Sequence, residues 1–546
     1  MLLKADTYEH LCQNFEWHLP EQYNIGVDVC DKWAEHTPHK TALVIVDDRN
    51  DARHVSFAEL KNVSNKTANL LKSINIHKGD RVGVLLPQSL ETAAVHVAIY
   101  KLASIAVPLF VLFGPEALEH RIVDAGIKII ITNKQGAEKL RLMSIEAQSQ
   151  LIIFTVDGAH HNLQTRDFHG EIISQSHEFT PVNTSADDPA LIIYTSGTTG
   201  SPKGALHAHR VLLGHLPGME MSHDFFPQPD DVIWTPADWA WIGGLLDVLL
   251  PALHHGVPVI TKRFDKFTAE AAYDLLSKHN VTNAFLPPTA LKLMRGAKHN
   301  PKTHPLQLRT VGSGGETLGA ELLDWGRATL GVTINEFYGQ TECNLIISSC
   351  ASIMEPQPGI MGRKVPGHNV AVIREDGTRC EIGEQGMIAV MRPDPVMFLE
   401  YWNNPAASEE KFIDGWLLTG DTGVEEGDNW VRFIGRDDDV ITSSGYRIGP
   451  GEIEDCLLRH EAVHMAAVVG KPDLTRTEIV KAYIVLHQKF DPAPQLAEEI
   501  KSHVKSRLAA YEYPREIEFL NEIPTTTTGK IMRRVLRQRA RDENLS

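Results

Sequence analysis

Residues 191–204 read LIIYTSGTTGSPKG, a short apolar run followed at once by glycines, hydroxyl side chains and one lysine. The apolar run at 191–194 predicts a buried strand, and the segment after it predicts a loop. Glycines let a backbone approach a polyphosphate closely, hydroxyl and N–H groups donate to its oxygens, and lysine offsets its charge. The residues that we expect to bind nucleotide phosphates here are Thr195, Ser196, Gly197, Thr198, Thr199, Gly200 and Lys203.

The common nucleotide P-loop, GxxxxGK[ST], does not fit this segment. Counted from Gly197, Pro202 stands where the second glycine belongs, and Gly204 stands where the magnesium-binding hydroxyl belongs. Both positions are needed in P-loop proteins, because the glycine admits the phosphates and the hydroxyl binds the metal. The loop therefore predicts phosphate binding outside the P-loop class.

Similar apolar runs that do not alternate with polar residues recur through the first 300 positions. They lie at 81–86, 105–109, 128–132, 151–156 and 257–261. Helical patterns separate them, for example at 91–102. Strands that are apolar on both faces are typical of parallel sheets covered by helices. We therefore predict an α/β fold whose large N-terminal domain has mixed, mainly parallel sheets layered with helices.

The pattern changes beyond residue 360. Short strands at 370–374, 386–391 and 430–434, separated by Gly/Asp turns, predict a small antiparallel, β-barrel-like part. A charged turn at 435–439 follows, after which helices and strands alternate again, with helices expected at 452–459 and 496–511 and strands at 466–469 and 481–486. We predict two domains, an N-terminal domain at 1–435 and a small, mobile α+β C-terminal domain at 436–546.

Charge and composition narrow the functional classes. The chain has 53 Lys and Arg against 70 Asp and Glu, a formal net charge of −17 at pH 7, which disfavours nucleic acid as a partner. The six cysteines contain no CxxC pair, which argues against a disulfide framework or a thiolate metal site. The longest apolar run, 102–113, is interrupted by Pro108 and is too short to span a membrane, which needs about 20 residues. Acidic residues near the N-terminus argue against a leader peptide. We expect a cytoplasmic protein, either a monomer or a homodimer.

Six further motifs follow the loop in order. They are GGET at 314–317, YGQTE at 338–342, TGD at 419–421, GRDD at 435–438, SSGYR at 443–447 and TGK at 528–530. Together with the loop they resemble the adenylate-forming (AMP-binding) superfamily, which includes acyl-CoA synthetases, adenylation domains of peptide synthetases and luciferases. The resemblance runs from about residue 25 to about residue 540.

This resemblance implies a carboxylate that attacks the α-phosphorus of ATP and expels pyrophosphate, with Mg²⁺ to help offset the charge of two anions. The implied catalytic residues are Lys530, Thr195, Glu342 and Arg447, with Thr195 and Glu342 also binding Mg²⁺. Lys530 would bridge the carboxylate and the phosphate. The other implied ATP/AMP contacts are Gly315, Glu316, Thr317, Glu336, Phe337, Tyr338, Gly339, Gln340, Thr341, Asp421, Arg436, Arg447 and Lys530.

A second half-reaction, thioester formation with CoA, is also implied. In the superfamily the C-terminal domain turns about a hinge, to which Asp438 corresponds. Lys530 then leaves the site, and Ser444 and Gly445 face the pantetheine thiol of CoA. The partners implied are a small carboxylic acid, ATP and CoA.

The acid is indicated by two segments. Residues 238–244 resemble the acyl-pocket lining of the acetyl- and medium-chain acyl-CoA synthetase branch, with Trp239, Trp241 and Ile242 as substrate contacts. Gly339 stands where acetate enzymes carry a tryptophan, and a smaller residue there predicts space for a medium-chain or branched acid. Core packing is the alternative for the tryptophans, and Cys343–Asn344 depart from the branch pattern. Acetyl, propionyl and aryl acids, and delivery to a carrier protein, remain alternatives.

Three other interpretations are weaker. HEAVH at 460–464 matches the HExxH zinc pattern, but the apolar run after it predicts a strand, so both histidines would not share a helix. The arginine-rich segment 530–541 has an apolar stripe, which favours a docked amphipathic helix over an RNA or membrane contact. A non-catalytic nucleotide sensor would be expected to lose Lys530 or Glu342, and the sequence has both.

Overall fold

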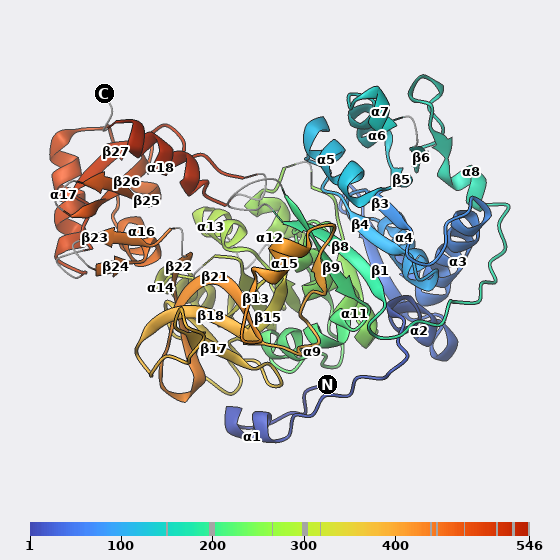
Figure 1. The fold of residues 1–546 in the computed structure, drawn as a ribbon, viewed down its shortest axis with the longest axis horizontal. Coiled ribbons are helices and arrows are strands. Elements are labelled where there is room, and N and C mark those ends of the chain that lie inside the picture. Colours follow the sequence, from blue (N-terminus) through green and yellow to red (C-terminus); the bar gives the residue numbers. More distant parts are fainter. Residues whose placement is uncertain are drawn as a thin grey trace.

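Three sheets organise the chain in the computed structural model. The structure describes residues 1–148, 151–195, 202–264, 266–297, 304–316, 318–436, 439–443, 446–473, 476–508, 512–526 and 530–543. Two large sheets form one body, and the third forms a smaller lobe to one side of it (Figure 1).

The first sheet has eight strands and contains the predicted phosphate loop. In spatial order they are β19 (Glu400–Tyr401), β9 (Lys203–Ala208), β8 (Pro189–Thr195), β4 (Ile105–Pro108), β3 (Arg81–Leu85), β5 (Ile129–Thr132), β6 (Ile152–Thr155) and β7 (Arg166–Asp167). The strands from β8 to β7 pair in parallel, whereas β9 pairs antiparallel with both β8 and β19. The apolar runs therefore form a mainly parallel sheet, as predicted.

The second sheet has fourteen strands and combines parallel and antiparallel parts. Its path is β17 (Val370–Ile373), β18 (Gln385–Met391), β21 (Trp416–Glu425), β22 (Trp430–Arg436), β16 (Ile360–Lys364), β15 (Cys343–Ser348), β14 (Ile334–Gln340), β13 (Thr310–Gly314), β12 (Asn283–Phe285), β10 (Ile233–Trp234), β11 (Val259–Thr261), β1 (Thr41–Val46) and β2 (Ala52–Ser56), with β20 (Phe412–Ile413) beside β21. The strands from β14 to β1 are parallel, and those from β15 to β17 are antiparallel. The antiparallel part predicted after residue 360 is thus joined to the parallel part through β15 and β16.

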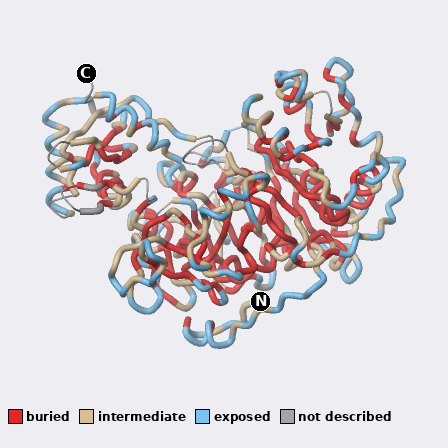
Figure 2. Tube along the Cα trace, in the orientation of Figure 1, coloured by how far each residue is buried: buried red, intermediate tan, exposed pale blue. Residues whose placement is uncertain are grey.

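Helices cover and separate these sheets. They are α1 (Tyr8–Gln13), α2 (Lys32–His36), α3 (Phe57–Ser73), α4 (Leu90–Lys101), α5 (Pro115–Ala125), α6 (Lys134–Leu140), α7 (Ile145–Gln148), α8 (Phe168–Ile172), α9 (Val211–Ser222), α10 (Ile242–Gly244), α11 (Leu250–His255), α12 (Ala269–Lys278), α13 (Pro288–Gly296), α14 (Ala320–Trp325) and α15 (Pro405–Glu409). Helix α4 is apolar on all sides, so almost every one of its residues is buried. It packs in the main hydrophobic core with residues of α3, α9 and α11, where buried residues are concentrated in Figure 2.

The small lobe contains the third sheet, with strands β24 (Tyr446–Ile448), β23 (Ile441–Ser443), β26 (Thr477–Leu486), β25 (Val463–Asp473) and β27 (Glu516–Phe519). Helices α16 (Pro450–Leu458), α17 (Pro494–Lys505) and α18 (Arg533–Asp542) cover it. It has its own apolar core around Ile453, Val468 and Ile484. The helix expected at 496–511 ends earlier, at Lys505.

Two minor sequence predictions are also resolved here. Helix α16 ends at Leu458 and β25 begins at Val463, so His460 and His464 do not share a helix. The arginine-rich segment forms α18, whose Leu536 and Ala540 are buried against Ala467, Val469 and Tyr483, so it is a docked amphipathic helix. Across the described ranges, no helix is long and apolar enough to cross a membrane.

Candidate active site

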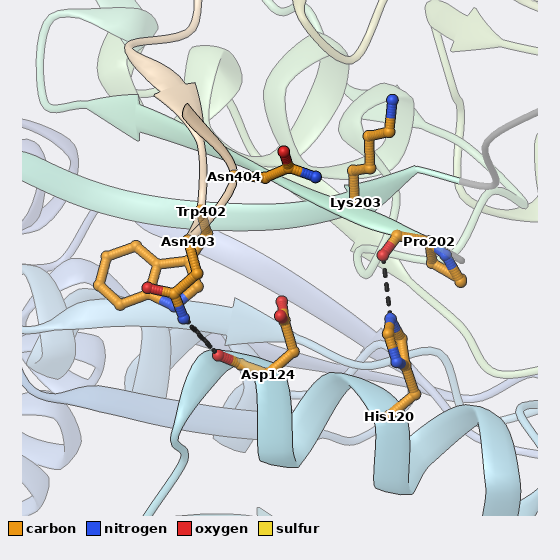
Figure 3. Close-up of a pocket in the computed structure, with 7 residues that line it drawn as sticks. All are labelled: His120, Asp124, Pro202, Lys203, Trp402, Asn403 and Asn404. Atoms are coloured by element: carbon orange, nitrogen blue, oxygen red, sulfur yellow. Dashed lines mark hydrogen bonds between the residues drawn. The ribbon is translucent and has the colours of Figure 1, made fainter. Parts of the chain in front are cut away.

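The β8–β9 hairpin forms the base of the predicted phosphate loop. Thr195 at the end of β8 faces Lys203 at the start of β9 across the antiparallel pair. Helix α5 holds this base, because His120 Nε2 donates to the carbonyl oxygen of Pro202 at 3.0 Å (Figure 3). The loop residues Ser196, Gly197, Thr198, Thr199 and Gly200 lie outside the described residues, so their phosphate contacts stay predictions.

A hollow of about 230 Å³ lies beside this hairpin, between α5 and the segment after β19. Its lining residues are His120, Asp124, Pro202, Lys203, Trp402, Asn403 and Asn404. Asn403 Nδ2 donates to the backbone oxygen of Asp124 at 3.0 Å, as Figure 3 shows. Helix α5 is therefore bonded both to the hairpin and to the 402–404 segment, which fixes the position of the loop's base.

Glu342 lies in the turn between β14 and β15, directly after Thr341, and is buried with 7% of its surface exposed. Tyr401 Oη donates to Glu342 Oε1 at 2.5 Å, and the Lys203 ammonium lies 5.1 Å from the Tyr401 ring centre. The structure shows no hydrogen bond to Glu342 Oε2 from any described residue. One carboxylate oxygen is thus held and the other is available to a cation.

This arrangement fits Mg²⁺. In the part of the chain that the structure describes, no group of three or more His, Cys, Asp or Glu side chains could hold a metal ion. Mg²⁺ is commonly bound by one or two carboxylates together with substrate phosphates and water. A single oriented carboxylate beside a phosphate loop meets that requirement.

Asp421 on β21 is the second buried carboxylate. Tyr338 Oη and Gln340 Nε2 both donate to its Oδ2, at 2.6 and 3.1 Å. The Arg436 guanidinium on β22 lies 3.6 Å from Oδ1, since Asp421 and Arg436 are paired across the two strands. Burial raises the pKa of Asp421, and Tyr338 and Arg436 oppose that shift. The strand pairing therefore holds a carboxylate acceptor beside a guanidinium group.

Lys530 reaches this region from the small lobe. A methyl group on Gly315 would lie 3.8 Å from both Lys530 Cε and Nζ, so the lysine touches the 314–316 turn. Gly315 has φ +98°, a conformation that favours glycine and keeps this approach open. Desolvation by the surrounding protein lowers the pKa of Lys530, while Glu316 and Asp421 oppose that shift. Segments more than 200 residues apart thus meet at one place.

The backbone around Lys530 is closed by its own hydrogen bonds. Thr526 N donates to the Lys530 carbonyl at 2.7 Å, and Lys530 N donates to Thr526 Oγ1 at 3.1 Å. Three residues later, α18 begins at Arg533. Lys530 is therefore bonded through its backbone to Thr526 and lies three residues before the docked helix.

Glu336 and Phe337 precede the YGQTE motif on β14. Burial raises the pKa of Glu336 well above its ordinary value, and its Oε2 has no hydrogen-bond partner among the described residues. The Phe337 ring lies 5.3 Å from that of Phe285. Glu336 is thus a buried carboxyl group with one unpaired oxygen, beside the predicted nucleotide site.

Two residues that sequence reasoning missed complete the cluster. Tyr401 orients Glu342, and Lys411 donates to the Leu418 and Thr419 carbonyls at 3.1 and 3.5 Å. Burial lowers the pKa of Lys411, and the charges of Glu342 and Asp421 oppose that shift. The sequence carries no periodic signal for either residue, because each acts through a partner that only the strand pairing brings near.

The predicted acyl contacts are divided between core and site. Trp239 is 1% exposed and belongs to the main core, so core packing accounts for its burial. Trp241 is half-buried, and its ring lies 5.3 Å from that of Phe110 and 5.9 Å from that of Phe113. Ile242, also half-buried, begins α10. An aromatic wall therefore exists at this segment, formed by Trp241, Phe110 and Phe113.

The space expected at Gly339 is not open. A Cβ placed there would lie 2.2 Å from the backbone nitrogen of Leu345 and 2.5 Å from Asn344 Oδ1. Backbone atoms at that distance cannot yield to a side chain. The glycine is required because the 344–345 segment packs directly against it, so the expectation that it leaves room for a longer acid is wrong. Asn344, one of the two residues that depart from the branch pattern, fills the position beside Gly339.

Several other predicted site residues fall outside the described residues. These are Thr317, Asp438, Ser444, Gly445 and the side chain of Arg447. Asp439, next to the predicted hinge, is described. It accepts a hydrogen bond from Arg537 Nη1, and its Oδ2 lies 3.8 Å from Arg533 Nη1.

Comparison with known proteins identifies the family of the chain. Residues 30–402 match the AMP-binding enzyme family model, and residues 452–530 match the model of the AMP-binding enzyme C-terminal domain. Acyl-coenzyme A synthetase ACSM4, mitochondrial, of Rattus norvegicus is 34% identical over 98% of this chain and 93% of its own length. Acetyl-coenzyme A synthetase of Bacillus subtilis is 32% identical over 97% of this chain and 94% of its own length.

Two solved structures of one protein, with and without ATP, allow the overall arrangement of the chain to be compared with both states. ATP-bound MatB from Rhodopseudomonas palustris is 26% identical, with a TM-score of 0.83 over 95% of this chain and 99% of its own. Apo MatB, of the same identity and coverage, has a TM-score of 0.74. The arrangement described here is therefore more similar to the ATP-bound state than to the apo state.

Proposed function

The chain belongs to the AMP-binding enzyme family, and we propose that it is an AMP-forming acid–CoA ligase that works in two half-reactions. It activates a carboxylic acid with MgATP to an acyl-AMP and pyrophosphate, and then transfers the acyl group to CoA. Ligases of this kind use ATP, Mg²⁺ and CoA. The observation that carries the proposal is the contact of Lys530 with Gly315, beside Asp421 and Arg436.

In the first half-reaction a carboxylate oxygen of the acid attacks the α-phosphorus, and the bond to the bridging oxygen breaks to release pyrophosphate. Two anions must approach each other, so fixed positive charge has to lie between them. Lys530 supplies that charge, while Asp421 and Arg436 hold the ribose and Thr341 faces the α-phosphate. Glu342 and Thr195 would hold Mg²⁺, which as a Lewis acid would offset phosphate charge.

In the second half-reaction the thiol sulfur attacks the acyl carbon, AMP leaves, and the thiol proton passes to solvent. Lys530 lies against Gly315, beside the proposed nucleotide site, so we expect thioester formation to require movement of the lobe. We place the domain boundary at residue 435 and the hinge at Asp438, with Ser444 and Gly445 turned toward CoA after rotation. Such closure and release by rigid lobes is a known way to gate chemistry.

For the acid we propose a medium-chain or branched acid. The support is the aromatic wall of Trp241, Phe110 and Phe113, together with the similarity to the acyl-coenzyme A synthetase ACSM4. Acetyl, propionyl and aryl acids are the alternatives, since the similarity to an acetyl-coenzyme A synthetase is nearly equal.

The test is acid-dependent pyrophosphate release across a panel of C2 to C12 and aromatic acids, with acyl-AMP detected by mass. Adding CoA should then yield AMP and the thioester. Absence of both pyrophosphate and acyl-AMP with every acid would refute the proposal. Transfer to a carrier-protein phosphopantetheine but not to free CoA would favour the carrier-protein alternative.

A further inference from the structure

A buried carboxyl–amide pair lies beside the predicted acyl segment. Asn344 Nδ2 donates to Asp247 Oδ1 at 2.6 Å, and the two residues are 4% and 3% exposed. Asp247 follows Gly243 by four residues, on the helical segment that continues α10. Asn344 packs against Gly339, so the pair lies between the acyl segment 238–244 and the YGQTE turn.

One oxygen of this pair has no partner. Oδ1 of Asp247 accepts from Asn344, but no hydrogen bond to Oδ2 is found in the described part of the chain. Oδ2 lies 3.6 Å from the position of a Cβ on Gly243, so it faces the segment that lines the predicted acyl site. Oδ2 is unpartnered but not completely enclosed by protein atoms, so a hydrogen-bond donor on a ligand can reach it.

The surroundings of the pair are aromatic. The Phe285 ring edge lies 2.9 Å from the position of a Cβ on Gly243, and Phe285 packs against Phe337. Burial raises the pKa of Asp247 well above its ordinary value, and the hydrogen bond from Asn344 opposes that shift. No cationic side chain among the described residues pairs with its carboxyl group. The carboxyl–amide pair therefore lies within a largely apolar enclosure.

From this arrangement we infer that Asp247 and Asn344 select an acid with a hydroxyl group at the end of the acyl group remote from its carboxylate. The inference rests on the proposed ligase function and names the class of acid for the same site. The hydroxyl group donates to Oδ2 of Asp247, the carboxyl oxygen that Asn344 does not reach. A plain hydrocarbon leaves Oδ2 unpaired, and a distal carboxylate is rejected because no cation is present to balance its charge.

The experiment compares acids of equal length that differ only at the distal carbon. Alkanoates of C4, C6 and C8 are paired with their ω-hydroxy and ω-carboxy forms, and benzoate is paired with 4-hydroxybenzoate. We expect at least one hydroxy acid to give a kcat/KM for pyrophosphate release about tenfold or more above its unsubstituted partner, the effect of one buried hydrogen bond. The ω-carboxy acids should be the poorest substrates.

Two variants assign the preference to the pair. Asp247→Leu replaces the carboxyl group by an apolar group of similar size and should abolish or reverse the hydroxy-to-alkyl ratio. Asp224→Leu is the matched control, because Asp224 Oδ1 also accepts from an asparagine amide, that of Asn335, at 3.1 Å. That variant should leave the ratio unchanged, and a ratio is insensitive to the fraction of protein that folds.

The outcomes separate the two proposals. Pyrophosphate release with every unsubstituted acid above its hydroxy partner in the unmodified enzyme overturns this inference and leaves the ligase function intact. A hydroxy preference that persists in Asp247→Leu also overturns it. If no acid releases pyrophosphate, the ligase proposal itself fails. If the Asp247 variant does not fold, the comparison in the unmodified enzyme still decides.

Discussion

Replacing Lys530 by alanine should separate the two half-reactions. Lys530 lies against the Gly315 turn, where the carboxylates of Glu316 and Asp421 favour its charged form. The other cations of the cluster are already engaged. Lys411 donates to two carbonyl oxygens, Lys203 lies over the Tyr401 ring, and Arg436 lies 3.6 Å from Asp421 Oδ1. No described neighbour is therefore placed to substitute for the lost ammonium group.

The expected loss can be bounded. Removing one group that stabilises developing charge in a closed site typically costs about 100- to 1000-fold in rate, or about 2.7–4 kcal/mol of activation free energy. We expect a loss of that size in acid-dependent pyrophosphate release by Lys530→Ala. Thioester formation from supplied acyl-AMP and CoA should stay unchanged, because Lys530 leaves the site for that step.

The assay is a pair of single-turnover measurements, one for each half-reaction, on the same preparation. Arg534→Ala is the matched control, since Arg534 is exposed on α18 and its loss removes one positive charge from the same lobe. That variant should leave both rates unchanged. Equal loss of both half-reactions in Lys530→Ala, with Arg534→Ala unaffected, would refute the role given to Lys530.

Three further outcomes follow from the same contacts. Tyr401→Phe removes the hydrogen bond to Glu342 and should raise the Mg²⁺ concentration for half-maximal adenylation about 10- to 100-fold, with unchanged affinity contradicting its orienting role. Gly339→Ala should reduce the free energy of unfolding by about 1–3 kcal/mol, through overpacking against Leu345, and should therefore lower the thermal midpoint. A midpoint equal to that of the unmodified protein would contradict the close contact. The lowered pKa of Lys530 means that its proton is lost at a lower pH than for an ordinary lysine, so adenylation should fall early on the alkaline side, and Lys530→Arg should move that limb upward. An alkaline limb that does not move in Lys530→Arg would show that another group titrates.

The strands of the parallel sheets were predictable because burial on both faces leaves a direct mark on the sequence. The runs that become β3, β5 and β6 have no polar alternation, and each lies between parallel neighbours. By contrast, the union of the antiparallel strands with the parallel part depends on β15 and β16 pairing. Such long-range pairing has no local signature.

The site was predictable as far as its motifs extend. Glu342, Asp421, Arg436 and Lys530 were each identified within a short motif, and the structure brings Asp421, Arg436 and Lys530 together. Tyr401 was not identified, because its role exists only through Glu342, 59 positions earlier.

Gly339 was interpreted wrongly for a related reason. A small residue was equated with empty space, whereas here it marks the close approach of the 344–345 backbone. A glycine in a sequence tells that a side chain is absent, but it cannot tell which neighbour occupies the volume.

Ion pairs connect Asp439, next to the predicted hinge position, to the helix that follows Lys530. Arg537 donates to Asp439, and Arg533 lies near the same carboxylate while it also pairs with Glu454 at 2.6 Å. These half-buried arginines belong to α18, which begins three residues after Lys530. The residue just beyond the predicted hinge is therefore ionically tied to the helix next to the lysine. A rotation about the predicted hinge would carry Asp439, α18 and Lys530 as one unit, so the core of the lobe need not rearrange.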